Sequence, residues 1–366
     1  MPARRSKPKT VAAASSVKKR KTIMDVAAEA GVDFSTVSLA LRNDPRIKPA
    51  TRERIQAAAR KIGYFPNQLA RSLSGGATRV IGVMFTEMSR FFAAPLEEFQ
   101  RVGEAAGYTL SVHFSWWDVE RERKGMIQFR DHRVDGVIWA PNVFDPSVAE
   151  TANILRDAGI PAVMIGLIHD DEARSVPCHQ IGIDVRQGLA LGIDHLAGMG
   201  HRRIAVATAT GMGGRRGDMF RLRLRLLREL FAERGLTLAD EDVYQTVDHE
   251  HGGIEIAMEF ARRPKGERPT AIFATEDSLA RSLAKSLHAL GIVVPRDVSL
   301  LGYDVGSDAP MGAVPLSTVS LESGDIANRA IEILLDLIRR RAASAPYEIT
   351  VVPAIIVERG SCAAPA

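Results

Sequence analysis

Residues 22–41, TIMDVAAEAGVDFSTVSLAL, predict two short helices joined by a tight turn. The hydroxyl of Thr22 can cap the free N–H groups of the first helix. Gly31 suits the position just past that helix, where a positive φ is common, and Asp33 can cap the second helix. In a helix-turn-helix, the leading positions of the second helix face base edges in the major groove. The expected DNA-binding positions of the second helix are therefore Phe34, Ser35, Thr36, Ser38 and Leu39, and Thr22 is also expected to bind DNA.

Apolar residues recur at helical spacing through both helices and through a third segment, residues 47–62. Pro49 lies in the first turn of this third helix, and Gly63 is expected to end it. One apolar face on each helix predicts a small three-helix headpiece with a shared core. The residues expected to point inward are Ile23, Val26, Ala27, Ala30, Val37, Ala40, Leu41, Ile55, Ala58, Ala59 and Ile62.

A second motif, TRERIQAAARKIGYFPNQLARSL, occupies residues 51–73. Together the two motifs resemble the lactose-repressor (LacI/GalR) family of bacterial transcription regulators. The first motif alone would also fit an ordinary two-helix hairpin with a glycine turn, but such a hairpin does not account for the second motif. Asp33 stands where the family usually has a small hydroxyl residue, and Leu39 where it often has a polar or basic one. These departures leave the operator sequence open.

The resemblance also implies a role for residues 67–78, which we expect to form a hinge helix and a flexible linker. In the family this helix becomes ordered on operator DNA and inserts a leucine into the minor groove. Leu73 falls at that position, and Asn67 and Ala70 are expected to contact DNA beside it. Without the resemblance, these residues would be interpreted as an ordinary linker helix.

Charge is distributed unevenly along the 366 residues, although the net charge is only +4. Residues 1–76 hold 16 Lys and Arg against 5 Asp and Glu, whereas the remainder holds 32 against 39. Such a basic end predicts a polyanionic partner, here double-stranded operator DNA. Residues 1–21 form a basic tail without acidic residues, which we expect to be disordered. The tail could add phosphate contacts or serve only as a solvated extension.

Several classes of protein are not expected from this composition. Cys178 and Cys362 are the only cysteines and belong to no ligand motif, so we expect no disulfide framework and no metal site. No apolar run approaches the roughly 18 residues of a membrane span, and no signal peptide precedes the first helix. We therefore expect a cytoplasmic protein that does not enter a membrane. No motif pairs a nucleophile with a base, so neither an enzyme nor a cofactor is expected.

From residue 79 onward, short apolar runs alternate with helical ones, which predicts parallel sheets covered on both faces. Residues 220–231 alternate like a strand at first, but their length and the stop at Gly235 favour a helix. The expected strands exceed what one sheet usually holds. They lie at residues 80–85, 109–114, 136–140, 162–165, 180–183, 204–208, 242–247, 271–274, 299–303 and 348–357.

The fold class predicted is thus an all-α helix-turn-helix headpiece with a hinge helix, followed by an α/β domain of two doubly wound parallel-sheet subdomains. The α/β domain is expected to resemble periplasmic sugar-binding proteins and to serve for effector binding and dimerisation. One subdomain would combine residues 79–180 with 310–340, and the other 181–309 with 341–360. The expected boundaries before them are 1–21 for the tail, 22–66 for the headpiece and 67–78 for the hinge.

A ligand is expected between the two subdomains, at the carboxyl ends of the strands. A carboxylate and a guanidinium there can bind the vicinal hydroxyls of a sugar by charge-assisted hydrogen bonds, which favours a carbohydrate effector. The alternatives are that Arg223 is one more basic residue on an arginine-rich helix, and that Phe91 and Phe92 belong to the core. The effector contacts implied by the resemblance are Phe91, Phe92, Asp184, Arg223, Glu276 and Asp304.

Two further motifs resemble binding sites only superficially. The glycine-rich loop at residues 211–216 has Arg216 where a dinucleotide fingerprint needs a glycine. His249 and His251 lack a third ligand, which is more typical of surface residues than of a metal site.

These features predict a repressor that binds a near-palindromic operator as a homodimer or tetramer and responds to a small molecule. One alternative is a soluble sugar-binding receptor without a regulatory role, and another is a DNA-binding protein without an effector. The headpiece and the missing signal peptide favour the ligand-responsive regulator.

Overall fold

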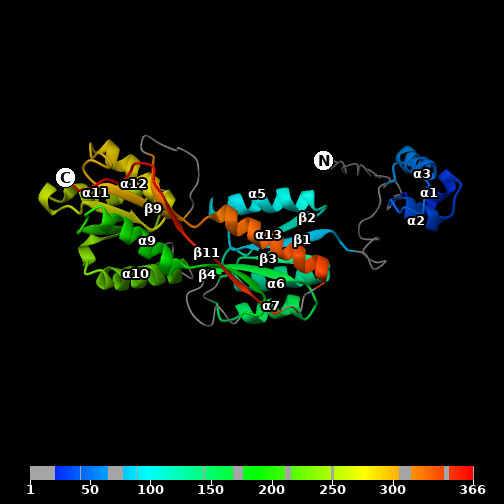
Figure 1. Ribbon diagram of the computed structural model, residues 1–366, viewed down its shortest axis with the longest axis horizontal. Coiled ribbons are helices and arrows are strands. Elements are labelled where there is room, and N and C mark those ends of the chain that lie inside the picture. Colours follow the sequence, from blue (N-terminus) through cyan, green and yellow to red (C-terminus); the bar gives the residue numbers. More distant parts are fainter. Residues whose placement is uncertain are drawn as a thin grey trace, which may run out of the picture. The chain divides into compact units, whose positions relative to one another are not determined.

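The computed structural model describes residues 21–41, 43–64, 77–88, 90–142, 145–167, 176–210, 216–248, 251–304, 315–341 and 346–365. The chain divides into two compact units, Met1–Thr78 and Arg79–Ala366 (Figure 1). Asn67, Ala70 and Leu73, and with them the predicted hinge helix, lie outside the described residues, as does the predicted tail up to residue 20. Among the helices of the described part, none is long and apolar enough to cross a membrane.

The first unit contains three helices whose ends follow from local chemistry. Helix α1 (Ile23–Ala30) begins with a capping box, in which the Thr22 hydroxyl accepts from the Asp25 N–H and the Asp25 carboxylate accepts from the Thr22 N–H. Gly31 ends α1 with φ at 62°, and α2 (Phe34–Leu41) follows after a short turn. Helix α3 (Pro49–Ile62) starts at a proline, whose missing N–H costs nothing in a first turn, and ends at Gly63.

The headpiece core consists of one apolar face from each of these helices, as predicted. Val26, Val37, Ala40 and Ile55 are completely buried. The expected face is thereby confirmed, with four of its members only partly buried at the edge of the cluster: Ile23, Ala30, Leu41 and Ile62.

The second unit contains two six-stranded sheets. The first has the order β11-β5-β4-β3-β1-β2 and is parallel throughout. Its strands are β1 (Val80–Phe85), β2 (Thr109–Phe114), β3 (Gly136–Trp139), β4 (Ala162–Leu167), β5 (His179–Ile183) and β11 (Ile349–Val352).

The second sheet has the order β12-β10-β9-β8-β6-β7, and in it only β12 runs antiparallel to its neighbour. Its strands are β6 (Ile204–Ala209), β7 (Val243–Thr246), β8 (Ala271–Ala274), β9 (Ser299–Asp304), β10 (Ser317–Ser320) and β12 (Ile355–Val357). The doubly wound α/β fold predicted from the alternating pattern is therefore confirmed.

Helices cover both faces of each sheet, in pairs that pack against each other (Figure 1). At the first sheet, α5 pairs with α13 and α6 with α7. At the second sheet, α9 pairs with α10 and α11 with α12. The bounds are α5 (Arg90–Ala105), α6 (Val119–Asp131), α7 (Val148–Arg156), α9 (Val185–Gly198), α10 (Arg216–Glu233), α11 (Gly253–Arg262), α12 (Asp277–Ala289) and α13 (Ser323–Arg340), with 3-10 turns at Asp240–Asp242 and Lys265–Glu267.

Within the described residues, three connections join the two sheets, and each leaves the carboxyl end of a parallel strand. Strand β5 leads into α9, β10 leads into α13, and β11 leads into β12. The side-chain amide of Gln187 links two of these connections, because it accepts from the Ala354 N–H at 3.0 Å and donates to the Ala354 carbonyl at 3.4 Å. The carboxyl edges of both sheets consequently lie beside the junction of the two subdomains.

Three strands differ from the predicted subdomain boundaries. Strand β5 belongs to the first sheet, although residues from 181 onward were expected in the second subdomain. Strand β10 belongs to the second sheet, although residues 310–340 were expected in the first subdomain. Strand β10 has no apolar run that could predict it. Its buried hydroxyls form hydrogen bonds within the protein; Thr318, for example, donates to Asp277 at 2.6 Å. Strand β11 belongs to the first sheet, because the single strand expected at residues 348–357 is divided after Val352, where Pro353 cannot donate to a ladder.

Candidate functional site

Helix α2 presents its leading residues outward from the headpiece. Its buried Val37 and Ala40 anchor it in the core, while Phe34 is 52% exposed and Ser35 is also exposed. Of the other predicted DNA-binding residues, Thr22 is exposed and three are partly buried along α2: Thr36, Ser38 and Leu39. The described candidates on α2 thus lie on a helix that is anchored in the core, and its first two residues are exposed.

Asp33 caps α2 by accepting hydrogen bonds from Ser35. Its Oδ1 accepts both from the Ser35 N–H at 2.8 Å and from the Ser35 hydroxyl at 2.6 Å. These hydrogen bonds from the Ser35 side chain and backbone lower the pKa of Asp33, so the carboxylate is ionised at neutral pH. The N-terminus of α2 therefore carries a fixed negative charge beside its exposed hydroxyl.

Two of the predicted effector residues come together at the carboxyl edge of the second sheet. Arg223 extends from α10, and Glu276 follows β8 as the N-cap residue of α12. Arg223 Nη1 lies 3.6 Å from Glu276 Oε1 and donates to the Thr275 carbonyl at 3.1 Å. The guanidinium also lies over the Tyr303 ring, 5.2 Å from its centroid.

This pair is largely removed from solvent, with side-chain exposures of 11% for Arg223 and 19% for Glu276. Among the described residues, no hydrogen-bond partner reaches the buried Nε of Arg223. A guanidinium with a spare donor next to a carboxylate offers both kinds of hydrogen bond to a polar ligand. Arg223 is thus not simply one more basic residue on the surface of α10.

The other four predicted effector residues show no arrangement that indicates a ligand: one caps a helix, one packs in the core, and two side chains are not described. Asp184 caps α9 by accepting from the Gln187 N–H at 2.9 Å, at one of the connections between the sheets. The Phe92 ring stacks on Phe85 with centroids 4.4 Å apart and packs against the core. The side chains of Phe91 and Asp304 lie outside the described residues.

A buried acidic residue at the carboxyl edge of the first sheet was not among the predicted site residues. Glu122, in the first turn of α6, is only 4% exposed, and the fully buried Ser115 and Trp139 lie beside it. Burial raises the pKa of Glu122 to about 7, although a hydrogen bond from the Asn142 backbone opposes the shift. In the sequence Glu122 belongs to the charged run VERERK, which resembles a solvated helix face. Its position in the first turn of the helix that follows β2 is the one signal that could have marked it.

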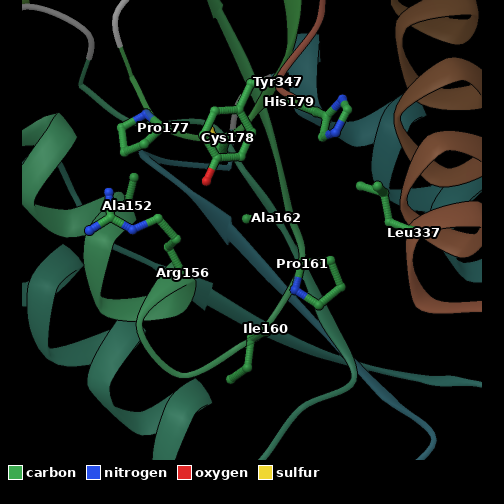
Figure 2. Close-up of a pocket in the computed structure, with 10 residues that line it drawn as sticks. All are labelled: Ala152, Arg156, Ile160, Pro161, Ala162, Pro177, Cys178, His179, Leu337 and Tyr347. Carbon is green, nitrogen blue, oxygen red and sulfur yellow. The ribbon is translucent and has the colours of Figure 1, made fainter. Parts of the chain in front are cut away.

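Figure 2 shows a small pocket at the opposite edge of the first sheet. Ala162 and His179, which line it, are the first residues of β4 and β5, and the Tyr347 ring lies edge-on to His179. The pocket is therefore at the amino ends of the strands, whereas ligands of open α/β sheets bind at the carboxyl ends. It is not the expected effector site.

Comparison with protein families matches both units of the chain. Residues 22–67 match the family "Bacterial regulatory proteins, lacI family", and residues 193–362 match the "Periplasmic binding protein-like domain". The transcriptional repressor PurR of Photobacterium profundum is 28% identical over 319 residues, covering 87% of this chain and 92% of the relative. The transcriptional regulator DegA of Bacillus subtilis is 29% identical over 300 residues, covering 82% of this chain and 86% of the relative.

Solved structures show the same fold across nearly the whole chain. The lac repressor dimer bound to operator and the anti-inducer ONPF is similar with a TM-score of 0.76 at 24% identity, covering 94% of this chain and 100% of that one. A LacI-family regulator from Silicibacter pomeroyi gives the same TM-score and identity, covering 93% of this chain and 99% of that one. Residues 22–67 therefore form a DNA-binding domain of the lacI family and residues 193–362 a periplasmic-binding-protein-like domain, and the chain is a DNA-binding transcriptional regulator.

Proposed function

We propose that the protein is a repressor that binds a near-palindromic operator as a homodimer, with α2 of each headpiece in the major groove. The observation that carries this proposal is the anchored α2 with its outward leading residues, on an N-terminal region that holds 16 basic against 5 acidic residues in 1–76. Two-fold symmetric helix-turn-helix proteins read two half-sites about one helical turn apart. The name of the Photobacterium relative, a transcriptional repressor, agrees with the direction of regulation proposed.

Selection from a randomised double-stranded DNA library with the full chain tests the proposal. We expect a near-palindromic sequence to be enriched. Its affinity should fall steeply between about 50 and 200 mM salt, because basic residues that contact phosphates release counterions. If no sequence is enriched, or if the affinity is flat over this range, operator binding by α2 is refuted.

The effector in this proposal is a sugar or sugar derivative, bound at the carboxyl edges of the two sheets. The argument is chemical: Arg223 and Glu276 form a mostly buried pair of opposite charge, and Arg223 Nε still has a hydrogen to donate. Vicinal hydroxyls can accept from a guanidinium and donate to a carboxylate at the same time. A ligand held at this edge would also touch the junction of the subdomains.

A thermal-shift screen of sugars, sugar phosphates and nucleobases tests this part, because a ligand that binds only the folded state raises the unfolding temperature. Arg223→Ala should abolish the shift caused by the ligand that the screen identifies. Arg225→Ala is the matched control, since Arg225 lies on the same helix with its side chain 67% exposed. If a nucleobase alone shifts the transition, or if both variants respond like the parent, the sugar proposal is wrong.

Regulation requires the ligand to favour one arrangement of the two subdomains over another. The ligand can change operator affinity only by its differential affinity for the two arrangements. Operator affinity should therefore change with the identified ligand in the parent and remain constant in Arg223→Ala. A receptor without a regulatory role would instead bind the ligand and select no DNA sequence.

A further inference from the structure

The hydroxyl of Ser35 can donate one hydrogen bond, and it donates that bond to Asp33. The Ser35 oxygen lies 2.6 Å from Asp33 Oδ1, and the Ser35 N–H donates to the same carboxylate oxygen at 2.8 Å. Since an ionised carboxylate can only accept, the direction of the hydroxyl hydrogen bond is fixed. Ser35 thus keeps its two lone pairs for another partner but has no hydrogen left to donate.

This arrangement restricts what the start of α2 can bind. Phosphate oxygens only accept hydrogen bonds, so the Ser35 hydroxyl cannot bind them while it donates to Asp33. The Asp33 carboxylate is likewise an acceptor only, and its charge repels phosphates. In the major groove, by contrast, cytosine presents the N4 amino group and adenine the N6 amino group as donors, whereas guanine and thymine present acceptors at the corresponding positions.

We propose that Asp33 and Ser35 form an acceptor-only edge of α2 that selects a base with an exocyclic amino group, N4 of cytosine or N6 of adenine, at one position in each operator half-site. Ser35 contacts the amino group, and Asp33 is a positioning residue that fixes the direction of the Ser35 hydroxyl. The inference rests on the proposed operator binding by α2. It adds the chemical class of base that this helix reads, at a position where Asp33 replaces the hydroxyl residue usual in the family.

The first experiment selects from the randomised duplex library with the full chain and three variants. Ser35→Ala removes the acceptor and should abolish the preference for adenine or cytosine at one position per half-site. Asp33→Ala frees the Ser35 hydrogen, so guanine and thymine should become acceptable at that position. Asp33→Asn keeps a side-chain oxygen that accepts from Ser35 and should retain the parental preference. Glu53→Gln, which removes one exposed negative charge from α3, controls for the loss of charge.

The second experiment uses the selected duplex with the amino group removed. Adenine is replaced by purine, or cytosine by 2-pyrimidinone, at each position in turn. At one position per half-site the parent should lose affinity on the order of tenfold, the effect of a lost hydrogen bond to a buried polar partner. Ser35→Ala should be insensitive to the replacement at that same position.

The outcomes separate this inference from the proposed function. If the parent selects no sequence, operator binding itself fails. If a sequence is selected but Asp33→Ala keeps the parental preference while remaining folded by circular dichroism, Asp33 is only a helix cap and the inference is overturned. Should Asp33→Ala fail to fold, the decision passes to Ser35→Ala on the amino-deleted duplexes, where unchanged sensitivity would equally overturn the inference.

Discussion

At the scale of single residues, burial of Glu122 makes the stability of the folded protein depend on pH near neutrality. The folded protein raises the pKa of this carboxyl from 4.5 to about 7, chiefly through burial. The folded state therefore holds the proton more tightly than the unfolded state does. This contribution to stability is complete below about pH 4.5 and is lost as the pH rises through about 7.

We expect Glu122→Gln to remove this pH dependence. Between pH 4.5 and 8 the parent should lose on the order of 3 kcal/mol relative to the variant, since each pKa unit corresponds to about 1.4 kcal/mol. The measurement is guanidinium unfolding of the second unit across this pH range, followed by tryptophan fluorescence. Glu120→Gln, exposed on the same helix, is the control and should keep the parental profile. Parallel profiles for Glu122→Gln and the parent would show that folding does not raise the pKa of Glu122.

At the scale of elements, two of the three glycines of α9 illustrate how a helix is fitted to a sheet. A Cβ on Gly192 would lie 2.5 Å from the ring of Phe273 on β8, whereas a Cβ on Gly198 would meet nothing within 4 Å. Neither position needs a positive φ, so packing alone distinguishes them. The close approach of α9 to the second sheet requires a residue without a side chain at Gly192.

Gly192→Ala should therefore destabilise the second unit by about 1–3 kcal/mol, the usual cost of overpacking a filled core. Gly198→Ala should be neutral or stabilise it by up to about 1 kcal/mol, because alanine favours the helix more than glycine does. Denaturant unfolding of the two variants measures both effects. Equal effects of the two substitutions would mean that Phe273 moves aside freely.

Elements with a regular apolar pattern were predicted well, and those held by polar contacts were not. The alternation from residue 79 onward indicated every strand from β1 to β9, because most of them carry a buried apolar run, although β2 is only partly buried. Strand β10 was not predicted, since its sequence STVS is polar. Its hydroxyls bond to distant partners: Thr318 donates to Asp277, and Ser317 accepts from the Arg359 N–H. The helix predicted at residues 220–231 is confirmed within α10.

At the scale of the whole molecule, the headpiece and the α/β unit have separate cores. The headpiece cluster around Val26, Val37 and Ile55 shares no member with the clusters of the two sheets. Each unit buries its own apolar surface, which is the basis of independent cooperative unfolding.

We therefore expect two transitions in differential scanning calorimetry of the full chain. Gly31→Ala should lower only the temperature of the headpiece transition. A Cβ there would meet no neighbouring atom, but the left-handed backbone at φ 62° is unfavourable for alanine. Gly192→Ala should lower only the transition of the α/β unit. If either substitution shifts both transitions together, the two units unfold as one.

The sequence by itself determined the three helices of the headpiece and the α/β class. Caps, the Gly31 turn and apolar periodicity depend on residues a few positions apart, so they can be interpreted without knowing the rest of the chain. Only the tertiary structure decided that Glu122 is buried, that Arg223 lies against Glu276, and that β10 and β11 belong to opposite sheets from those predicted. Each of these outcomes depends on segments distant in sequence that pack together, and burial and charge pairing are properties of that packing.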